Sequence, residues 1–138
     1  MSHGRLGQAM LASAEMICGT VDDAATVDLQ PGETPEALGD RVRAAVGDGA
    51  QPVLVLTDLV GGTPHNVAIL ICAEAAVEGR QVACVSGANL GVLIEAATSL
   101  ASLEPASIAG LVERGRDGLV DVMARLAEQR AARRNAAG

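Results

Sequence analysis

The sequence predicts an α/β fold, in which a mainly parallel sheet carries helices on both faces. Short apolar runs of strand character alternate with longer segments of helical periodicity along the chain. One run, Val53-Leu54-Val55-Leu56, is uninterrupted, as in a parallel strand that is buried on both faces. The 138 residues, 49% of them hydrophobic, suffice for one sizeable core. We therefore expect a single domain over residues 1–130.

The first half of the chain supplies a helix, a strand and a second helix. Apolar residues recur at helical spacing over residues 6–18, which predicts the first helix. Residues 25–29 indicate a short strand. Thr34, followed by Pro35 and Glu36, is typical of a capped helix start, and this helix is expected to run to Val46.

The second half continues the alternation of strand and helix. The expected elements are a strand at 52–57, a helix at 64–78, a strand at 81–86 and a helix at 89–100. Residues 105–130 are predicted to be mostly helical, with a weak point near Gly115 and Gly118. We expect residues 131–138 to form a frayed tail. The arginines of this end indicate a solvated helix face, with an anionic surface as the alternative partner.

The segment from Thr57 to Asn66 joins a buried strand to a helix through a turn suited to an anion. Gly61 and Gly62 allow the backbone to approach a ligand closely, and Pro64 can open the following helix. The first N–H groups of a helix attract phosphate. The sequence therefore predicts a phosphate site here, with Asp58 at the carboxyl end of the strand.

His3 lies immediately before the first helix, in the segment Ser2-His3-Gly4-Arg5. A histidine that is neutral near pH 7 can accept a phosphoryl group as a nucleophile and pass it on. His3 is one of two histidines in the chain. We interpret it as a candidate phosphoacceptor, with a disordered terminal residue as the alternative.

Three ordered motifs together resemble the enzyme IIA domain of the mannose family of the bacterial phosphoenolpyruvate-dependent sugar phosphotransferase system. The first is Ser2-His3-Gly4 with the helix ending Glu15-Met16-Ile17-Cys18-Gly19. The second is the run from Thr57 to Asn66, and the third is carried by Gly87, Asn89, Leu90 and Leu93. Gly91 and Val92 stand where the family usually has Pro and Met, and His65 stands where an aromatic residue is common.

This resemblance implies a flavodoxin-like, doubly wound sheet with strand order 2-1-3-4. In such a sheet the turns after successive parallel strands open on one edge, so His3, Asp58 and Asn89 should converge there. The family's first strand would precede Ser2, where this sequence has only Met1. We therefore expect a truncated central strand, and we hypothesise a misassigned start codon, with Met1 an internal residue of a longer chain.

The resemblance further implies a phosphocarrier cycle. The histidine phosphocarrier protein HPr would phosphorylate His3, which would pass the group to a IIB component and so to the membrane IIC and IID subunits. Asp58 would hold the ring of His3, while Thr63 and the N–H groups around Gly61 and Gly62 would bind the phosphoryl oxygens. Asn89 would lie at the site edge. The mechanism requires no metal and no cofactor, and the family's members often pair as homodimers.

Several of these residues also have simpler interpretations. Asp58 could merely cap the following turn, Thr63 could be a helix N-cap, and Asn89 is most simply an N-cap as well. His65 is more readily a surface or half-buried helix residue than a second phosphoacceptor. The cysteines, Cys18, Cys72 and Cys84, lie in apolar contexts without metal-ligand spacing, which indicates reduced thiols.

Composition excludes several other functions. The chain has a net charge of −7 and no Phe, Tyr or Trp, which disfavours binding of nucleic acid. It lacks the lysine of a P-loop and the Gly-x-Ser-x-Gly elbow of serine hydrolases. No apolar run is long enough to span a membrane, and no signal-peptide layout is present. We expect a cytoplasmic location, peripheral to the inner membrane at most through permease partners.

Two alternatives to sugar transport remain at this stage. One is the phosphotransfer subunit of a dihydroxyacetone kinase, for which the Gly-Gly-Thr-Pro run fits less well. The other is a regulatory phosphoprotein whose phosphorylation state is sensed by a binding partner. The sugar itself leaves no trace in such a sequence, because a IIA domain contacts only other proteins.

Overall fold

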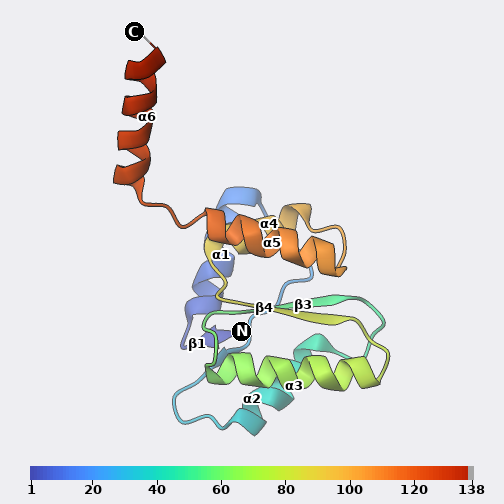
Figure 1. Cartoon of the computed structure of the whole chain (residues 1–138). Coiled ribbons are helices and arrows are strands. Elements are labelled where there is room, and N and C mark those ends of the chain that lie inside the picture. The colour runs from blue at the N-terminus through green and yellow to red at the C-terminus, as the bar shows by residue number, and fades with distance from the viewer. Residues whose placement is uncertain (137–138) are drawn as a thin grey trace.

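Strands and helices alternate from β1 to α4, two further helices follow, and the strands lie between two layers of helices (Figure 1). The computed structural model describes residues 1–136. The strands are β1 (Ser2–His3), β2 (Asp28–Leu29), β3 (Val53–Thr57) and β4 (Val82–Ser86). The helices are α1 (Leu6–Cys18), α2 (Pro35–Val46), α3 (Thr63–Val77), α4 (Leu90–Ser99), α5 (Pro105–Asp117) and α6 (Val122–Ala136). The predicted α/β architecture is confirmed.

The strands form two parallel pairs rather than one continuous ladder. β1 pairs with β2 through Ser2↔Asp28 and His3↔Leu29, and β3 pairs with β4 over the full length from Val53↔Val82 to Thr57↔Ser86. The N-terminal ammonium of Met1 donates to the carbonyl of Leu56 at 2.7 Å, which places β1 beside β3. The neighbours thus follow the predicted order 2-1-3-4, but β1 is too short to extend the ladder to β3.

A cavity of about 450 Å³ lies beside Met1 and β3. Its walls include Met1, Thr26 and Val27 on one side and Val53, Leu54 and Leu56 of β3 on the other. The strand predicted over residues 25–29 is correspondingly reduced to Asp28–Leu29. Within residues 1–136, no strand pairs with residues 25–27, so these residues form no ladder hydrogen bonds.

The core is divided between the two faces of the strands. On one face, α2 and α3 bury Leu38, Val42, Val67 and Ile71 together with Val27. On the other face, Val85 packs with Val92 of α4 and Leu111 of α5. α1 lies in the same layer as α4 (Figure 1). This two-sided burial explains the uninterrupted apolar run of β3.

The helix break that the sequence predicted near Gly115 and Gly118 occurs at Gly118 and not at Gly115. α5 ends at Asp117 and Gly118 follows it, whereas Gly115 lies inside α5 and is buried. A side chain at Gly115 would collide with Val92, so this glycine serves close packing of α5 against α4. α6 then continues through residues 131–136 of the segment expected as a tail, and residues 137–138 lie outside the described part. α6 projects from the body (Figure 1).

None of the helices in residues 1–136 is both long enough and apolar enough to cross a membrane.

Candidate functional site

His3 ends β1 at the edge of the sheet where the parallel strands have their carboxyl ends. Gly4 follows with φ +65°, a conformation that glycine adopts readily, and the chain turns there into α1. The main-chain N–H of Gly4 donates to the carbonyl of Leu29 at 3.0 Å. The His3 side chain is 44% exposed, so part of its ring is open to solvent.

Asp58 follows β3 directly and holds His3 at two points. Its Oδ2 atom accepts the main-chain N–H of His3 at 2.9 Å and lies 2.9 Å from the ring Nδ1. Because an ionised carboxylate only accepts hydrogen bonds, Nδ1 must carry the proton. The other ring nitrogen, Nε2, then keeps its lone pair in the neutral imidazole and can act as a nucleophile.

The environment of Asp58 favours its charged form. Burial raises the pKa of this carboxyl, but the hydrogen bonds from the main chain and ring of His3, with the attraction of that ring, outweigh burial and lower the pKa below its ordinary value. The side chain is only 10% exposed, and its Oδ1 atom has no hydrogen-bond partner among the described residues. Asp58 therefore supports a positive charge on the ring.

The turn between β3 and α3 lies against the Cε1–Nε2 edge of the His3 ring. A Cβ atom on Gly62 would fall 2.9 Å from Cε1 and 3.4 Å from Nε2 of His3, so only glycine leaves the ring its place. Gly61 has φ +79°, and Gly62 is the N-cap of α3. Thr63 is the first residue of α3, not its N-cap. The start of α3, whose first N–H groups have no intrahelical acceptor, thus faces the region of Nε2.

Two predicted site residues, Thr63 and Asn89, make no hydrogen bond with His3 among the described residues. No hydrogen bond of the Thr63 hydroxyl is present among the described residues. Asn89 caps α4, as its simpler interpretation predicted: its Oδ1 accepts the N–H of Val92 at 3.0 Å, and its Nδ2 donates to the carbonyl of Gly115 at 3.0 Å. The amide of Asn89 is therefore engaged between α4 and α5.

The second histidine belongs to a separate hydrogen-bond chain. Nδ1 of His65 contacts the hydroxyl of Ser86, which lies 2.6 Å from the hydroxyl of the fully buried Thr57. Ser86 ends β4, and β4 is on the opposite side of β3 from β1. This chain ties α3 to the ends of β3 and β4, which agrees with the prediction of a half-buried helix residue.

The polar contacts next to His3 were not predicted from the sequence. The hydroxyl of Ser2 donates to Oδ1 of Asp28 at 2.6 Å, and both side chains are buried. The available signal was a lone carboxylate in the predicted strand 25–29, flanked by Val27 and Leu29. A buried acid in a strand needs a donor, and Ser2 provides one.

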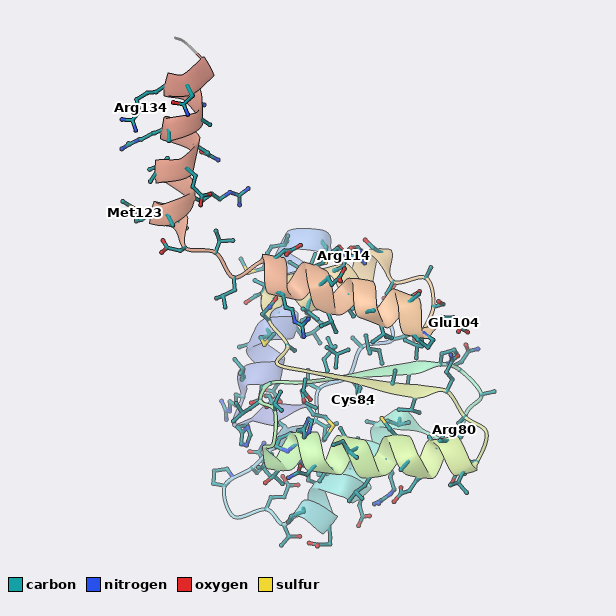
Figure 2. All side chains as sticks on the ribbon, viewed as in Figure 1. Arg80, Cys84, Glu104, Arg114, Met123 and Arg134 are labelled. Atoms are coloured by element: carbon teal, nitrogen blue, oxygen red, sulfur yellow. The ribbon has the colours of Figure 1, made fainter. Side chains whose placement is uncertain are left out.

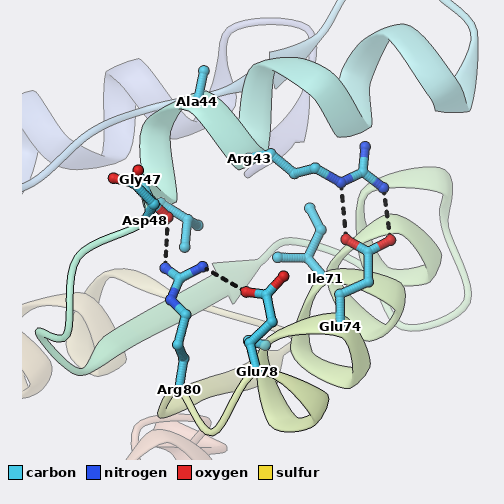
Figure 3. Close-up of a pocket in the computed structure, with 10 residues that line it drawn as sticks. Arg43, Ala44, Gly47, Asp48, Ile71, Glu74, Glu78 and Arg80 are labelled. Atoms are coloured by element: carbon cyan, nitrogen blue, oxygen red, sulfur yellow. Dashed lines mark hydrogen bonds and ion pairs between the residues drawn. The ribbon is translucent and has the colours of Figure 1, made fainter.

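A second cavity, also of about 450 Å³, lies far from His3, between the C-terminal ends of α2 and α3 (Figure 3). Its cations are already paired. Arg43 makes two hydrogen bonds of 2.8 Å with Glu74, and Arg80 contacts Glu78 and the carbonyls of Gly47 and Gly49. These guanidinium groups are therefore not available to an anion, and we assign no site there.

Metal-binding geometry is absent from residues 1–136, where no cluster of three or more His, Cys, Asp or Glu side chains could hold an ion. The three cysteines are free and half-buried, and burial raises the pKa of the Cys72 and Cys84 thiols.

Comparison with known proteins gives consistent matches. The family model described as PTS system fructose IIA component matches residues 1–113. The mannose-specific EIIAB component of Escherichia coli K12 is 31% identical over 136 residues, which cover 94% of this chain and 40% of that protein. The sorbose-specific EIIA component of Lacticaseibacillus casei is 30% identical over 72% of this chain and 70% of its own length. The chain thus spans less than half of the first of these relatives.

Solved structures match over most of the chain. The mannose/sorbose-specific IIA subunit of the Enterococcus faecalis phosphotransferase system is 35% identical, with a TM-score of 0.79 over 88% of this chain and 90% of that one. The phosphotransferase system component EIIA of Streptococcus agalactiae is 28% identical, with a TM-score of 0.80 over 89% of this chain and 94% of that one.

Proposed function

The chain belongs to the mannose/fructose-type family of phosphotransferase-system IIA components, and from this premise we propose that it is a phosphocarrier that acts through His3. It accepts a phosphoryl group from phosphorylated HPr and passes it to a IIB component for sugar uptake and phosphorylation. The observation that carries the proposal is the 2.9 Å contact between Nδ1 of His3 and Asp58, which leaves Nε2 free beside Gly62.

The proposed step exchanges one phosphorus–nitrogen bond for another. The lone pair of Nε2 attacks the phosphorus of the donor's phosphohistidine, and the donor imidazole leaves with the electrons of the broken bond. The ring of His3 then carries a phosphoryl group on Nε2 and a proton on Nδ1, and the Asp58 carboxylate stabilises its positive charge. Transfer to the IIB component reverses these roles. Such transfer depends on alignment and charge stabilisation more than on further covalent chemistry.

The start of α3 supplies the donors for the phosphoryl oxygens in this proposal. The N–H of Thr63 lies in the first turn of α3, where helix geometry offers no intrahelical acceptor. The Thr63 hydroxyl and the backbone around Gly61 and Gly62 complete the group. Gly62 N–H makes a long bond of 3.3 Å, to the carbonyl of Leu59. Asn89 contributes at the site edge by holding the start of α4.

Exposed apolar residues next to the site suit contact with protein partners. Leu59 and Val60, in the same turn as Gly61, are 59% and 67% exposed. HPr and the IIB component are the partners that would cover them in turn, and the membrane IIC and IID subunits would be reached only through IIB. The proposed location is the cytoplasm.

We also propose a homodimer, supported by the C-terminal helix. α6 carries exposed apolar side chains at Val122 (69%) and Met123 (73%), just after Leu119 (91%). Figure 2 shows Met123 and Arg134 on a helix that stands clear of the body. A second copy could cover these residues. Sedimentation equilibrium of the full chain and of Met123→Ser tests this: a dimer weakened by the substitution supports it, and a monomeric wild type contradicts it.

Phosphoryl transfer to the purified chain tests the central proposal. The full-length protein is incubated with phosphoenolpyruvate, enzyme I and HPr, and the acid-labile phosphoryl group is measured. We expect labelling of the wild type and loss of labelling in His3→Ala, with retention in the matched variant His65→Ala.

Labelling that persists in His3→Ala and disappears in His65→Ala would place the phosphoacceptor on α3 and overturn the proposal. Omitting HPr separates direct transfer from enzyme I from the proposed route. Adding the IIB component should discharge the labelled chain.

A further inference from the structure

We propose that Ser2 and Asp28 form a buried clamp that sets the register of β1 and thereby aims the ring of His3 at Asp58 and Gly62. Both are positioning residues, because neither touches the reacting nitrogen. The inference rests on the proposed function of His3 and adds two residues to it.

The clamp joins three elements through short hydrogen bonds. The hydroxyl of Ser2 donates to Oδ1 of Asp28 at 2.6 Å and accepts the N–H of Gly7, in α1, at 2.7 Å. Oδ2 of Asp28 accepts the N–H of Gln8 at 3.3 Å. Ser2 is 2% exposed and Asp28 is 3% exposed, so water does not compete for these contacts. β1, β2 and α1 are thus fastened at one point.

The clamp also supplies the missing cap of α1. Arg5 occupies the N-cap position without a side-chain hydrogen bond, and the first turn of α1 has no acidic residue. The carboxylate of Asp28 reaches this helix end from β2, where a negative charge is favoured by the helix dipole. Gly7 makes room for it, since a Cβ atom there would lie 2.5 Å from Oδ1 of Asp28.

Register matters here because β1 has only two residues. Successive side chains of a strand point to opposite faces, so a slip by one residue would turn His3 toward the interior and Ser2 toward the site. A two-residue ladder holds its register weakly by backbone bonds alone. The Ser2–Asp28 bond forms in one register only, and in that register His3 faces Asp58.

The carboxylate at residue 28 has a role that an apolar side chain could not fill. An apolar residue would suit a buried strand next to Val27 better, because burying a carboxylate costs free energy unless donors compensate. Those donors are Ser2 and the first turn of α1, and both flank His3 in the chain. The polar contact therefore specifies an orientation that apolar packing would leave open.

Steady-state phosphotransfer from phospho-HPr tests the clamp in Ser2→Ala, Ser2→Thr and Asp28→Asn. We expect Ser2→Ala and Asp28→Asn to lower kcat about tenfold, as displacement of a reacting group does, with KM for phospho-HPr changed less than about twofold. Ser2→Thr keeps the hydroxyl and should recover most of the rate. The matched controls are Ser13→Ala and Asp48→Asn, which remove a hydroxyl and a charge far from His3.

Ring ¹⁵N spectra of His3 provide a readout that does not depend on transfer. The wild type should show the Nδ1–H tautomer, and both disruptive variants should show a mixture. All rates are expressed per folded molecule, from circular dichroism at the assay temperature. If Asp28→Asn does not fold, the comparison of Ser2→Ala with Ser2→Thr tests the clamp.

Rates per folded molecule within twofold of wild type, with an unchanged tautomer, would overturn the clamp and leave Ser2 and Asp28 as stabilising residues only. Failure of the wild type to be labelled would instead count against the proposed function, and the ring spectra would still test the clamp.

Discussion

The two strand pairs of this molecule are built differently, and His3, the proposed phosphoacceptor, lies on the weaker one. β3 and β4 share a five-residue register and bury apolar residues on both faces. β1 and β2 share two residues, and β1 is held by polar contacts from Ser2, from His3 and from the Met1 ammonium. The long pair thus carries Asp58 and leads into the start of α3, while hydrogen bonds position His3 against them.

This difference teaches that stability and transfer should respond to different substitutions. Changes in the long pair should alter the free energy of unfolding and leave the geometry of His3 intact in the folded molecules. Changes around β1 should alter the geometry of His3 with a smaller effect on stability. Four predictions follow this division, from the largest expected effect to the smallest.

Leu111→Ala should have the largest effect on stability. Leu111 is fully buried against Val85 and Val92, and such truncations cost about 2–5 kcal/mol because a cavity remains. Urea unfolding measures the loss, with Leu119→Ala as the exposed control, for which we expect a change within about 0.5 kcal/mol. The rate of phosphoryl transfer to His3 per folded molecule should stay unchanged. A loss of this rate together with the loss of stability would contradict the division between the two strand pairs.

A designed apolar extension before Met1 should strengthen the short pair. Val and Ile residues that enter the cavity beside β3 would gain about 1.5–3 kcal/mol per fully buried side chain. They would also replace the Met1 ammonium, whose pKa burial lowers against the opposing effect of Asp28 and Asp58, by a neutral amide. Urea unfolding against a Gly-Ser extension of equal length provides the measurement. Equal stabilities of the two extended proteins would show that the cavity does not accept a strand.

Gly62→Ala should impair transfer more than stability. Its Cβ would lie 2.9 Å from Cε1 of His3, so the ring must move. Overpacking of this kind costs about 1–3 kcal/mol, and less where a half-exposed ring can turn away. We expect a lower kcat for phosphotransfer. Gly49→Ala, which meets no neighbour, is the control. A normal rate of phosphotransfer in Gly62→Ala would contradict the assigned contact between this turn and Nε2.

Asp58→Asn should change the pH dependence of stability by the smallest amount. The pKa of Asp58 is lowered in the folded state, so its contribution is fully present above the unfolded value of about 3.9 and is lost as pH falls through the folded value. With His3 partly exposed, we expect up to about 1 kcal/mol at neutral pH. Unfolding free energies from pH 7 to pH 2, compared with Asp48→Asn, provide the test. A difference in unfolding free energy between the wild type and Asp58→Asn that grows toward low pH would contradict this prediction.

The sequence by itself determined the alternation of elements, the ends of α1 to α4 within about a residue, and the encounter of His3 with Asp58. Local signals suffice for the elements and their ends. Helical periodicity, the capping side chains of Thr34 and Asn89 and the run of β3 depend on neighbours in the chain. The parallel arrangement then places the ends of β1 and β3 on one edge of the sheet, so two motifs far apart in sequence predicted one site.

Only the tertiary structure decided how His3 is held. The division into two strand pairs, the clamp of Ser2 on Asp28 and the bond from Asn89 to Gly115 each join segments that no local pattern connects. The same holds for Gly115, which looked like a helix breaker and is instead a packing contact with Val92. A hydrogen bond or a close contact depends on where two distant atoms meet, and that position is set by the packing of all the elements between them.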